Sequence, residues 1–203
     1  CQYNLESGEQ CKNRTVSTAP FCWLHTKKLF GVRVKPSTRF PRELGLFASR
    51  EFKPGDLIAP YFGDIIDETE LSKRYGAAED DNAPYTLQID KKEYSDSACY
   101  RSAASYTNDP RKSEKPAPSQ ANGKFAYTKK VTFPLVNGNK LISKKNKHYG
   151  IIKARRKISP GTEILVDYGK EYKMSDSINH RTTSYIKSGQ SLCKRNYISQ
   201  SKR

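Results

Sequence analysis

Three cysteines and one histidine near the start of the chain form a set that could bind a metal ion. They are Cys1, Cys11, Cys22 and His25, separated by nine, ten and two residues. Three thiolates and one imidazole are a common tetrahedral ligand set for structural zinc. A segment this short cannot build an apolar core of its own, so the metal would supply its folding energy. We therefore predict a zinc knuckle over residues 1–29; the alternative is a set of unrelated free cysteines in a disordered start.

A second candidate group lies near the end of the chain, where Tyr168 stands between Asp167 and Gly169. The preceding stretch, Glu163–Val166, is short and apolar, which is typical of a buried strand. The pattern thus predicts a buried strand that leads to a tyrosine on a polar loop. The alternative is a packed tyrosine whose hydroxyl is satisfied at the edge of the core.

The elements that must position these groups read as short strands joined by turns. The chain has 203 residues with twelve glycines, eleven prolines and thirteen tyrosines, which favours strands and turns over long helices. One short helix is expected after Asp67, with Glu70 at the capping-box position and Gly76 as its stop. The expected strands are Leu46–Ala48, Leu57–Tyr61, Asp64–Ile66, Tyr85–Asp90, Phe125–Leu135, Lys140–Ser143, Tyr149–Ala154 and Glu163–Val166, with a hairpin turn at 136–139.

Charge is the other strong signal. The chain has 37 basic and 21 acidic residues, a net charge of +16. From Lys115 to Thr162 there are twelve Lys or Arg residues and no acidic residue. A charge run is usually a solvated face, but this one is long enough to predict contact with nucleosomal DNA or another nucleic acid. An acidic protein partner is the alternative. No apolar run approaches the ~20 residues that span a bilayer, so we expect no membrane contact.

Four sequence blocks resemble the SET-domain protein lysine methyltransferases. The first two are Gly45-Leu46-Phe47-Ala48 and Tyr61-Phe62-Gly63-Asp64, which match the family's G-x-G-L-x-A and Y-x-G-E-x-I blocks. The third is Ser105-Tyr106-Thr107-Asn108-Asp109, followed by Asn122, and it matches R-F-x-N-H-S and its later asparagine. The fourth and most specific block keeps Ala154, Arg156, Ile158, Gly161, Glu163, Ile164, Asp167, Tyr168, Gly169 and Tyr172 in register.

The resemblance implies a fold and a division of the chain. The fold would be mainly β with short helices: a SET-type β-clip of small sheets with a knot-like C-terminal threading, preceded by the zinc knuckle. The SET-like catalytic domain would cover residues 30–172, with an insert and loop region at 77–123. Residues 173–203 would form a basic tail without the cysteine cluster that many members carry after the domain.

The resemblance also implies a reaction and its residues. The activity would be methyl transfer from S-adenosylmethionine to a lysine, with a histone tail in chromatin as the substrate and the nucleus as the location. Tyr168 would lie at the transfer site, Tyr61 would line the lysine channel, and Tyr85 is a third candidate. The cofactor would lie against Leu44, Gly45, Leu46, Asn108 and Asp109. A partner subunit could complete the channel.

A second reading comes from a different functional class. Glu43 and Ser105 stand where the family has a glycine and an arginine, and the tail has only Cys193. These departures favour a catalytically silent SET-like module that binds nucleic acid or chromatin through its basic surface. A third possibility is methylation of a protein other than a histone.

Overall fold

The computed structural model describes residues 1, 3–13, 21–40, 43–75, 83, 85–98, 102–112, 120–128 and 149–169. Several sequence-based expectations lie outside these residues. They are the stop at Gly76, the turn at 136–139, the strand Lys140–Ser143, the end of Phe125–Leu135, the tail 173–203 and much of the basic stretch 115–162.

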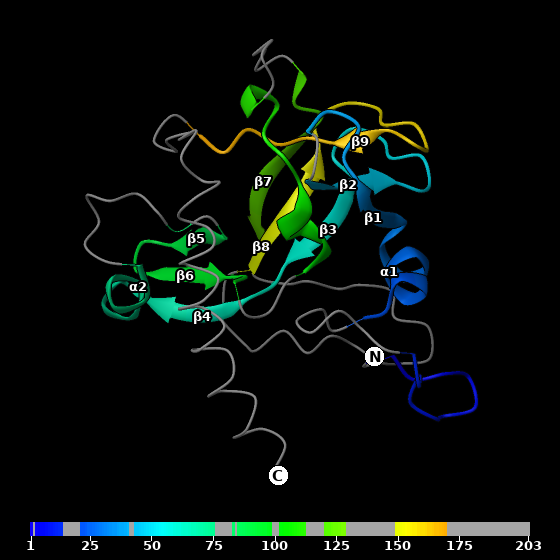
Figure 1. The fold of residues 1–203 in the computed structure, drawn as a ribbon, viewed down its shortest axis with the longest axis horizontal. Helices are drawn as coiled ribbons and strands as arrows, with labels where there is room; N and C mark the ends of the chain where they lie inside the picture. Colours follow the sequence, from blue (N-terminus) through cyan, green and yellow to red (C-terminus); the bar gives the residue numbers. More distant parts are fainter. Residues whose placement is uncertain are drawn as a thin grey trace.

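The described part consists of short strands with two α-helices and two 3-10 turns (Figure 1). In chain order the elements are α1 (Trp23–Phe30), β1 (Val32–Pro36), β2 (Leu44–Ala48), β3 (Leu57–Tyr61), β4 (Asp64–Asp67), α2 (Glu68–Tyr75), β5 (Thr86–Asp90), β6 (Glu93–Asp96), η2 (Ala103–Tyr106), η3 (Pro110–Lys112), β7 (Gly123–Thr128), β8 (Tyr149–Ala154) and β9 (Glu163–Ile164).

The strands form three small antiparallel sheets with the orders β1-β2-β9, β3-β8-β7 and β4-β6-β5. The expectation of a mainly β fold with short helices is confirmed. β3 and β8 have the predicted bounds, and β2, β4 and β5 differ from the prediction by one or two residues. The predicted helix cap is also present, because the backbone N–H of Glu70 donates to Asp67 Oδ1 over 2.8 Å.

The last strand is shorter than the prediction Glu163–Val166. β9 ends at Ile164, because the next two residues leave β2 and form parallel bridges elsewhere: Leu165 with Asn108 and Val166 with Gly123. The backbone N–H of Val166 donates to Asn108 O over 3.0 Å, and the N–H of Gly123 donates to Leu165 O over 2.9 Å. The chain therefore passes between two earlier segments here.

α1, β1 and β6 were not predicted from the sequence. α1 has a weak helical pattern, because only His25 and Phe30 of its eight residues are buried. It ends at Gly31, whose φ of 68° is left-handed and whose N–H donates to Lys27 O over 2.9 Å. Glycine adopts this conformation without the steric cost that other residues meet. β1 then starts at once and pairs with β2.

The knuckle and the sheets share one apolar core. Tyr3, Cys11, Phe21 and Cys22 belong to the same buried cluster as the sheet residues that follow them. The largest fully buried apolar side chains of the sheets and their loops are Phe52, Leu46, Ile58, Ile151, Ile152, Ile158, Ile164, Val32 and Val166. The described residues of this N-terminal segment are thus packed into the main fold.

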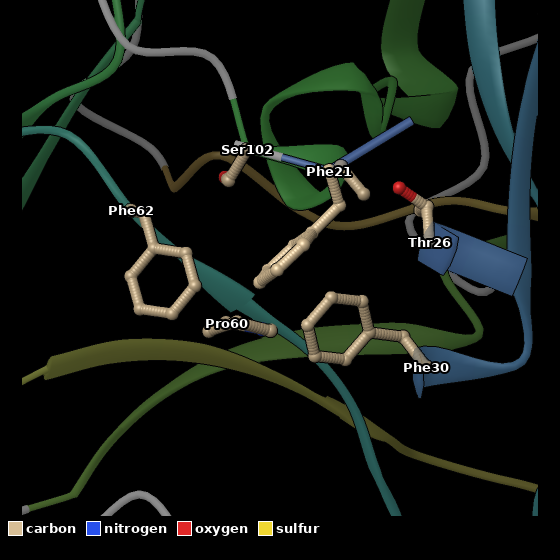
Figure 2. Close-up of a pocket in the computed structure, with 7 residues that line it drawn as sticks. Phe21, Thr26, Phe30, Pro60, Phe62 and Ser102 are labelled. Carbon is tan, nitrogen blue, oxygen red and sulfur yellow. The ribbon is translucent and has the colours of Figure 1, made fainter. Parts of the chain in front are cut away.

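A small cavity remains at this junction. Figure 2 shows Phe21 and Phe30 facing Pro60 and Phe62, with Thr26 and Ser102 at the rim. Its volume of about 20 Å³ has room for about one water molecule. It is therefore too small for a nucleoside cofactor or a lysine side chain.

An ion-pair cluster attaches α2 to the third sheet. Arg74 contacts Asp96 at 2.8 Å, Glu70 at 3.0 Å and Asp64 at 3.1 Å. Burial alone would lower the pKa of Arg74, but its hydrogen bonds to these carboxylates raise it above the usual range. A Cβ on Gly63 would collide with the backbone of Asp96, so only glycine allows this close approach.

No helix in the described ranges has the length and apolar character needed to cross a membrane.

Replacing Arg74 with alanine should destabilise the fold. Asp96 is fully buried, and loss of its cationic partner would leave an uncompensated charge, at a cost of about 3–5 kcal/mol in the free energy of unfolding. Urea denaturation followed by circular dichroism measures this. Lys73→Ala, an exposed neighbour on the same helix, is the matched control and should change stability by less than about 0.5 kcal/mol. Equal losses of unfolding free energy in the two variants would contradict the role of Arg74 as the charge partner of Asp96.

Candidate functional site

The predicted metal ligands lie together. One ligand atom from each of Cys1, Cys11, Cys22 and His25 falls within 4.8 Å of all the others. Cys22 Sγ lies 3.1 Å from His25 Nδ1, and Cys1 Sγ lies 3.5 Å from the same nitrogen. With zinc–ligand bonds of about 2.0–2.3 Å, tetrahedral neighbours are about 3.5 Å apart, so the donor set and its spacing fit zinc.

The surroundings of this cluster favour the protonation states that bind a metal ion, namely thiolate for Cys22 and neutral imidazole for His25. Burial opposes ionisation of Cys22, but hydrogen bonds from the His25 backbone and the Asn13 side chain more than offset it and lower the pKa of the thiol. Burial and the nearby positive charge of Lys28 lower the pKa of His25, which favours neutral imidazole. The ring of Tyr3 stacks on His25 with centroids 3.8 Å apart, which fixes the imidazole plane.

Tyr168 is held at both ends by the segment that contains Asn108. Its hydroxyl donates to the carbonyl oxygen of Thr107 over 2.6 Å, and its backbone N–H donates to Asp109 Oδ2 over 2.7 Å. The third and fourth sequence blocks, about sixty residues apart, are thus in direct contact. Tyr168 is partly buried, so its ring packs against the core while one edge stays accessible.

Asp109 is fully buried and depends on Arg111 for charge compensation. Arg111 Nη2 lies 2.7 Å from Asp109 Oδ2, and Arg111 Nε lies 3.1 Å from both carboxylate oxygens. The same guanidinium donates to Gly169 O over 2.9 Å and lies 3.5 Å from Asp167. The hydrogen bond to Asp109 raises the pKa of Arg111. This pair therefore fixes the loop on both sides of Tyr168.

A row of aromatic rings leads from Tyr168 to the other predicted tyrosines. The ring centroid of Phe125 lies 6.3 Å from that of Tyr168 and 5.9 Å from that of Tyr61. The Tyr61 hydroxyl donates to the backbone carbonyl of Tyr85 over 2.9 Å. The three predicted tyrosines thus belong to one region, with Tyr85 joined to it through its main chain.

The predicted cofactor residues adjoin this region, but they differ in what they offer a ligand. Leu44 is 47% exposed and its carbonyl accepts a 3.1 Å hydrogen bond from the Asn108 amide. Gly45 is buried beside it, and the side chain of Leu46 is fully buried in the core. The carboxylate of Asp109 is fully buried. A ligand could therefore meet the exposed Leu44 and the main chain of these residues, but not the side chains of Leu46 and Asp109.

Glu163, at the start of β9, forms hydrogen bonds at the corner where Leu44, Gly45 and Asn108 meet. Its carboxylate is buried and accepts hydrogen bonds from Ser37 Oγ at 2.9 and 3.1 Å and from the Asn108 amide at 3.2 Å. Thr38 Oγ1 lies 3.3 Å from it. A Cβ on Gly45 would collide with this carboxylate, so any side chain at position 45 would force Glu163 to shift.

The sequence patterns predicted no role for Thr107, Arg111, Phe125 or Glu163. Arg111 could have been found from its position two residues after Asp109, a spacing that lets opposite charges meet in a turn. Phe125 follows Asn122 closely, but nothing local indicates that its ring falls between two distant tyrosines. The role of Thr107 is carried by its carbonyl oxygen, which no side-chain pattern can reveal.

Two departures in the matched blocks are accommodated by the structure. Glu43 is exposed, immediately before β2. The Ser105 hydroxyl donates to Ser102 O over 2.8 Å and closes the turn of η2.

A protein-family model for the SET domain matches residues 43–169, more than half of the chain. Comparison with curated protein sequences found no match.

Solved structures with a similar fold include ctPRC2 in an autoinhibited conformation bound to S-adenosylmethionine. The TM-score is 0.51 at 18% identity, over 82% of this chain and 17% of that chain. Another is the polycomb repressive complex 2 (PRC2) of Chaetomium thermophilum, with a TM-score of 0.48 at 19% identity, over 70% of this chain and 15% of that chain. This chain thus spans less than a fifth of either chain, and the first likeness supports the fold.

Removing metal from the Cys1, Cys11, Cys22 and His25 cluster should destabilise the whole fold, because the cluster belongs to the shared core. We expect the purified protein to contain zinc in a ratio of about one per chain, measured by plasma mass spectrometry. Cys22→Ser should lose the metal and more than about 4 kcal/mol of unfolding free energy. Cys193→Ser, which changes a cysteine outside the cluster, should keep the metal. A metal-free native protein of full stability would refute the site.

Replacing Arg111 with glutamine should loosen the Tyr168 loop. The buried Asp109 carboxylate would lose its charge partner, at a cost of about 3–5 kcal/mol in unfolding free energy. Hydrogen exchange of the Tyr168 and Gly169 amides should accelerate, because their loop loses its anchor. The control is Arg155→Gln, an exposed arginine after β8, which should leave both readings unchanged. Unaltered exchange in the Arg111 variant would show that the pair does not hold the loop.

Proposed function

This chain belongs to the SET-domain family, and on that basis we propose that it transfers a methyl group from S-adenosylmethionine to a lysine side chain of a protein. The observation that carries the proposal is the placement of Tyr168. Its hydroxyl is fixed by a 2.6 Å hydrogen bond to Thr107 O, beside Asn108 and at the end of the aromatic row.

The cofactor would be held mainly by main-chain groups. Leu44, Gly45 and Asn108 are the candidates, because they meet at one corner and Leu44 is exposed there. Glu163 fixes this corner by accepting hydrogen bonds from Ser37 and Asn108. When bound, S-adenosylmethionine supplies an electrophilic methyl group on a sulfonium.

The chain's own residues would orient the lysine amine and keep it neutral. Tyr61, Phe125 and Tyr168 provide an aromatic wall, and burial against such a wall disfavours the charged ammonium. With its proton directed at Thr107, the Tyr168 hydroxyl presents its oxygen as an acceptor, which can align an amine hydrogen. The rate gain would come mostly from positioning and from fixed dipoles.

The proposal extends to the substrate and its setting. We take the substrate to be a histone tail in chromatin and the location to be the nucleus, in keeping with the SET family and with a similar structure described as PRC2. The basic stretch 115–162 would contact nucleosomal DNA, and a partner subunit would complete the lysine channel. Zinc bound by the knuckle would have a structural role.

The first test is binding of S-adenosylmethionine, measured by isothermal titration calorimetry on the full 203-residue chain. Absence of binding at millimolar cofactor would end the enzyme proposal and favour the silent module. If the cofactor binds, methylation of nucleosomes, free histones and other proteins distinguishes the substrate classes.

Tyr168→Phe should lower kcat by on the order of 10²-fold, because the variant loses the hydroxyl dipole at the transfer site. The affinity for S-adenosylmethionine should change by less than about threefold, since the backbone contacts remain. Tyr127→Phe, at an exposed tyrosine on β7, is the control. Full activity of the Tyr168 variant would remove this residue from the proposed site.

A further inference from the structure

A second stretch without acidic residues, besides 115–162, lies near the start of the chain. Residues 10–42 contain eight Lys or Arg residues and no Asp or Glu. The structure describes two elements from this stretch, the helix α1 and the strand β1, which follow each other directly. Figure 1 shows them side by side, on the opposite side of the molecule from the sheet β4-β6-β5.

The most exposed large apolar side chain in the described ranges is on this surface. Trp23, at the start of α1, is 63% exposed, and Leu24 beside it is 44% exposed. Trp23 is also the only tryptophan in the chain. The helix attaches to the core through His25 and Phe30, so the indole is not needed for docking the helix. A large aromatic ring left in water in this way is suited to stacking on a ligand.

The neighbouring strand β1 carries two exposed cations, one of which lies over this ring. The guanidinium carbon of Arg33 lies 5.8 Å from the centroid of the Trp23 ring. Lys35, two residues further on, is also exposed, and its Nζ lies 4.0 Å from the centroid of Phe47. Residues two apart on a strand point to the same face and are about 6.6 Å apart. This spacing is comparable with that of successive phosphates in an extended nucleic-acid strand.

We propose that Trp23, Arg33 and Lys35 form a binding surface for single-stranded nucleic acid. A base stacks on the indole while successive phosphates meet the two cations, the combination that single-strand binding proteins use. An acidic peptide would satisfy the cations but gives the indole no planar partner. A duplex also gives the indole no free base to stack on, because its base faces are stacked inside the helix. Single-stranded RNA and DNA share the required chemistry, and the experiment separates them.

Because Trp23 is the only tryptophan, its fluorescence reports directly on the surface. The full-length protein is titrated with oligouridine and with oligothymidine, and the emission of Trp23 is recorded. Stacking should quench the emission. The dissociation constant should rise with salt, as expected when phosphate counterions are released. The ratio of the two affinities shows whether the surface prefers RNA or DNA.

Variants isolate the two components of the surface. Trp23→Ala should weaken binding of a fluorescently labelled oligonucleotide by about 5- to 100-fold, from loss of one stacked base. Trp23→Phe should recover much of this loss. The double variant Arg33→Gln, Lys35→Gln should reduce the slope of log affinity against log salt by about 1.4, for two phosphate contacts on a single strand. Circular dichroism and metal content confirm that each variant remains folded.

The matched comparison is Ile65→Ala, at another exposed apolar side chain, 40% accessible on β4 and outside both stretches that lack acidic residues. It should leave oligonucleotide affinity unchanged. Three results would overturn the proposal: no quenching at saturation, equal losses of oligonucleotide affinity in Ile65→Ala and Trp23→Ala, or binding of polyglutamate to the parent protein as tightly as the oligonucleotides.

Discussion

The site depends on one hydrogen bond, from the backbone N–H of Tyr168 to the buried carboxylate of Asp109. It connects two segments about sixty residues apart in the sequence. A charge with no exposed surface is stable only when it is paired, and Arg111 supplies that pairing while also bonding to Gly169 O. Asp109 falls at the histidine position of the R-F-x-N-H-S block that this segment resembles. Here an aspartate and an arginine together hold the loop that carries the tyrosine.

A second buried carboxylate fixes the opposite side. Glu163 begins β9 and gathers the hydroxyls of Ser37 and Thr38 and the amide of Asn108. It also fills the space in which a side chain at Gly45 would lie. The region proposed to hold the cofactor and the region proposed to hold the lysine are thus each ordered by an acidic group inside the protein. This explains how a site made largely of main-chain groups can keep its shape.

Local patterns predicted much of this arrangement, and the rest depends on contacts between distant segments. β3 and β8 were predicted with their correct bounds, because apolar runs between glycine and proline turns mark buried strands well. The fourth sequence block led to Tyr168. The place of Phe125 between Tyr61 and Tyr168 could not be predicted, since it depends on how β7 pairs with β8 and β8 with β3. α1 was missed because it buries too few residues to give a helical pattern.

The knuckle is part of the fold that positions the site. Cys22 and His25 lie at the start of α1, and α1 ends at Gly31, whose carbonyl accepts the N–H of Ser49 just after β2. β1 then pairs with β2, β2 pairs with β9, and β9 leads within four residues to Tyr168. Each step is a hydrogen-bonded or covalent link, so one continuous sheet connects the Cys1, Cys11, Cys22 and His25 cluster to the tyrosine. The four predicted ligands therefore adjoin the outer strand of the sheet whose last strand leads to the Tyr168 loop.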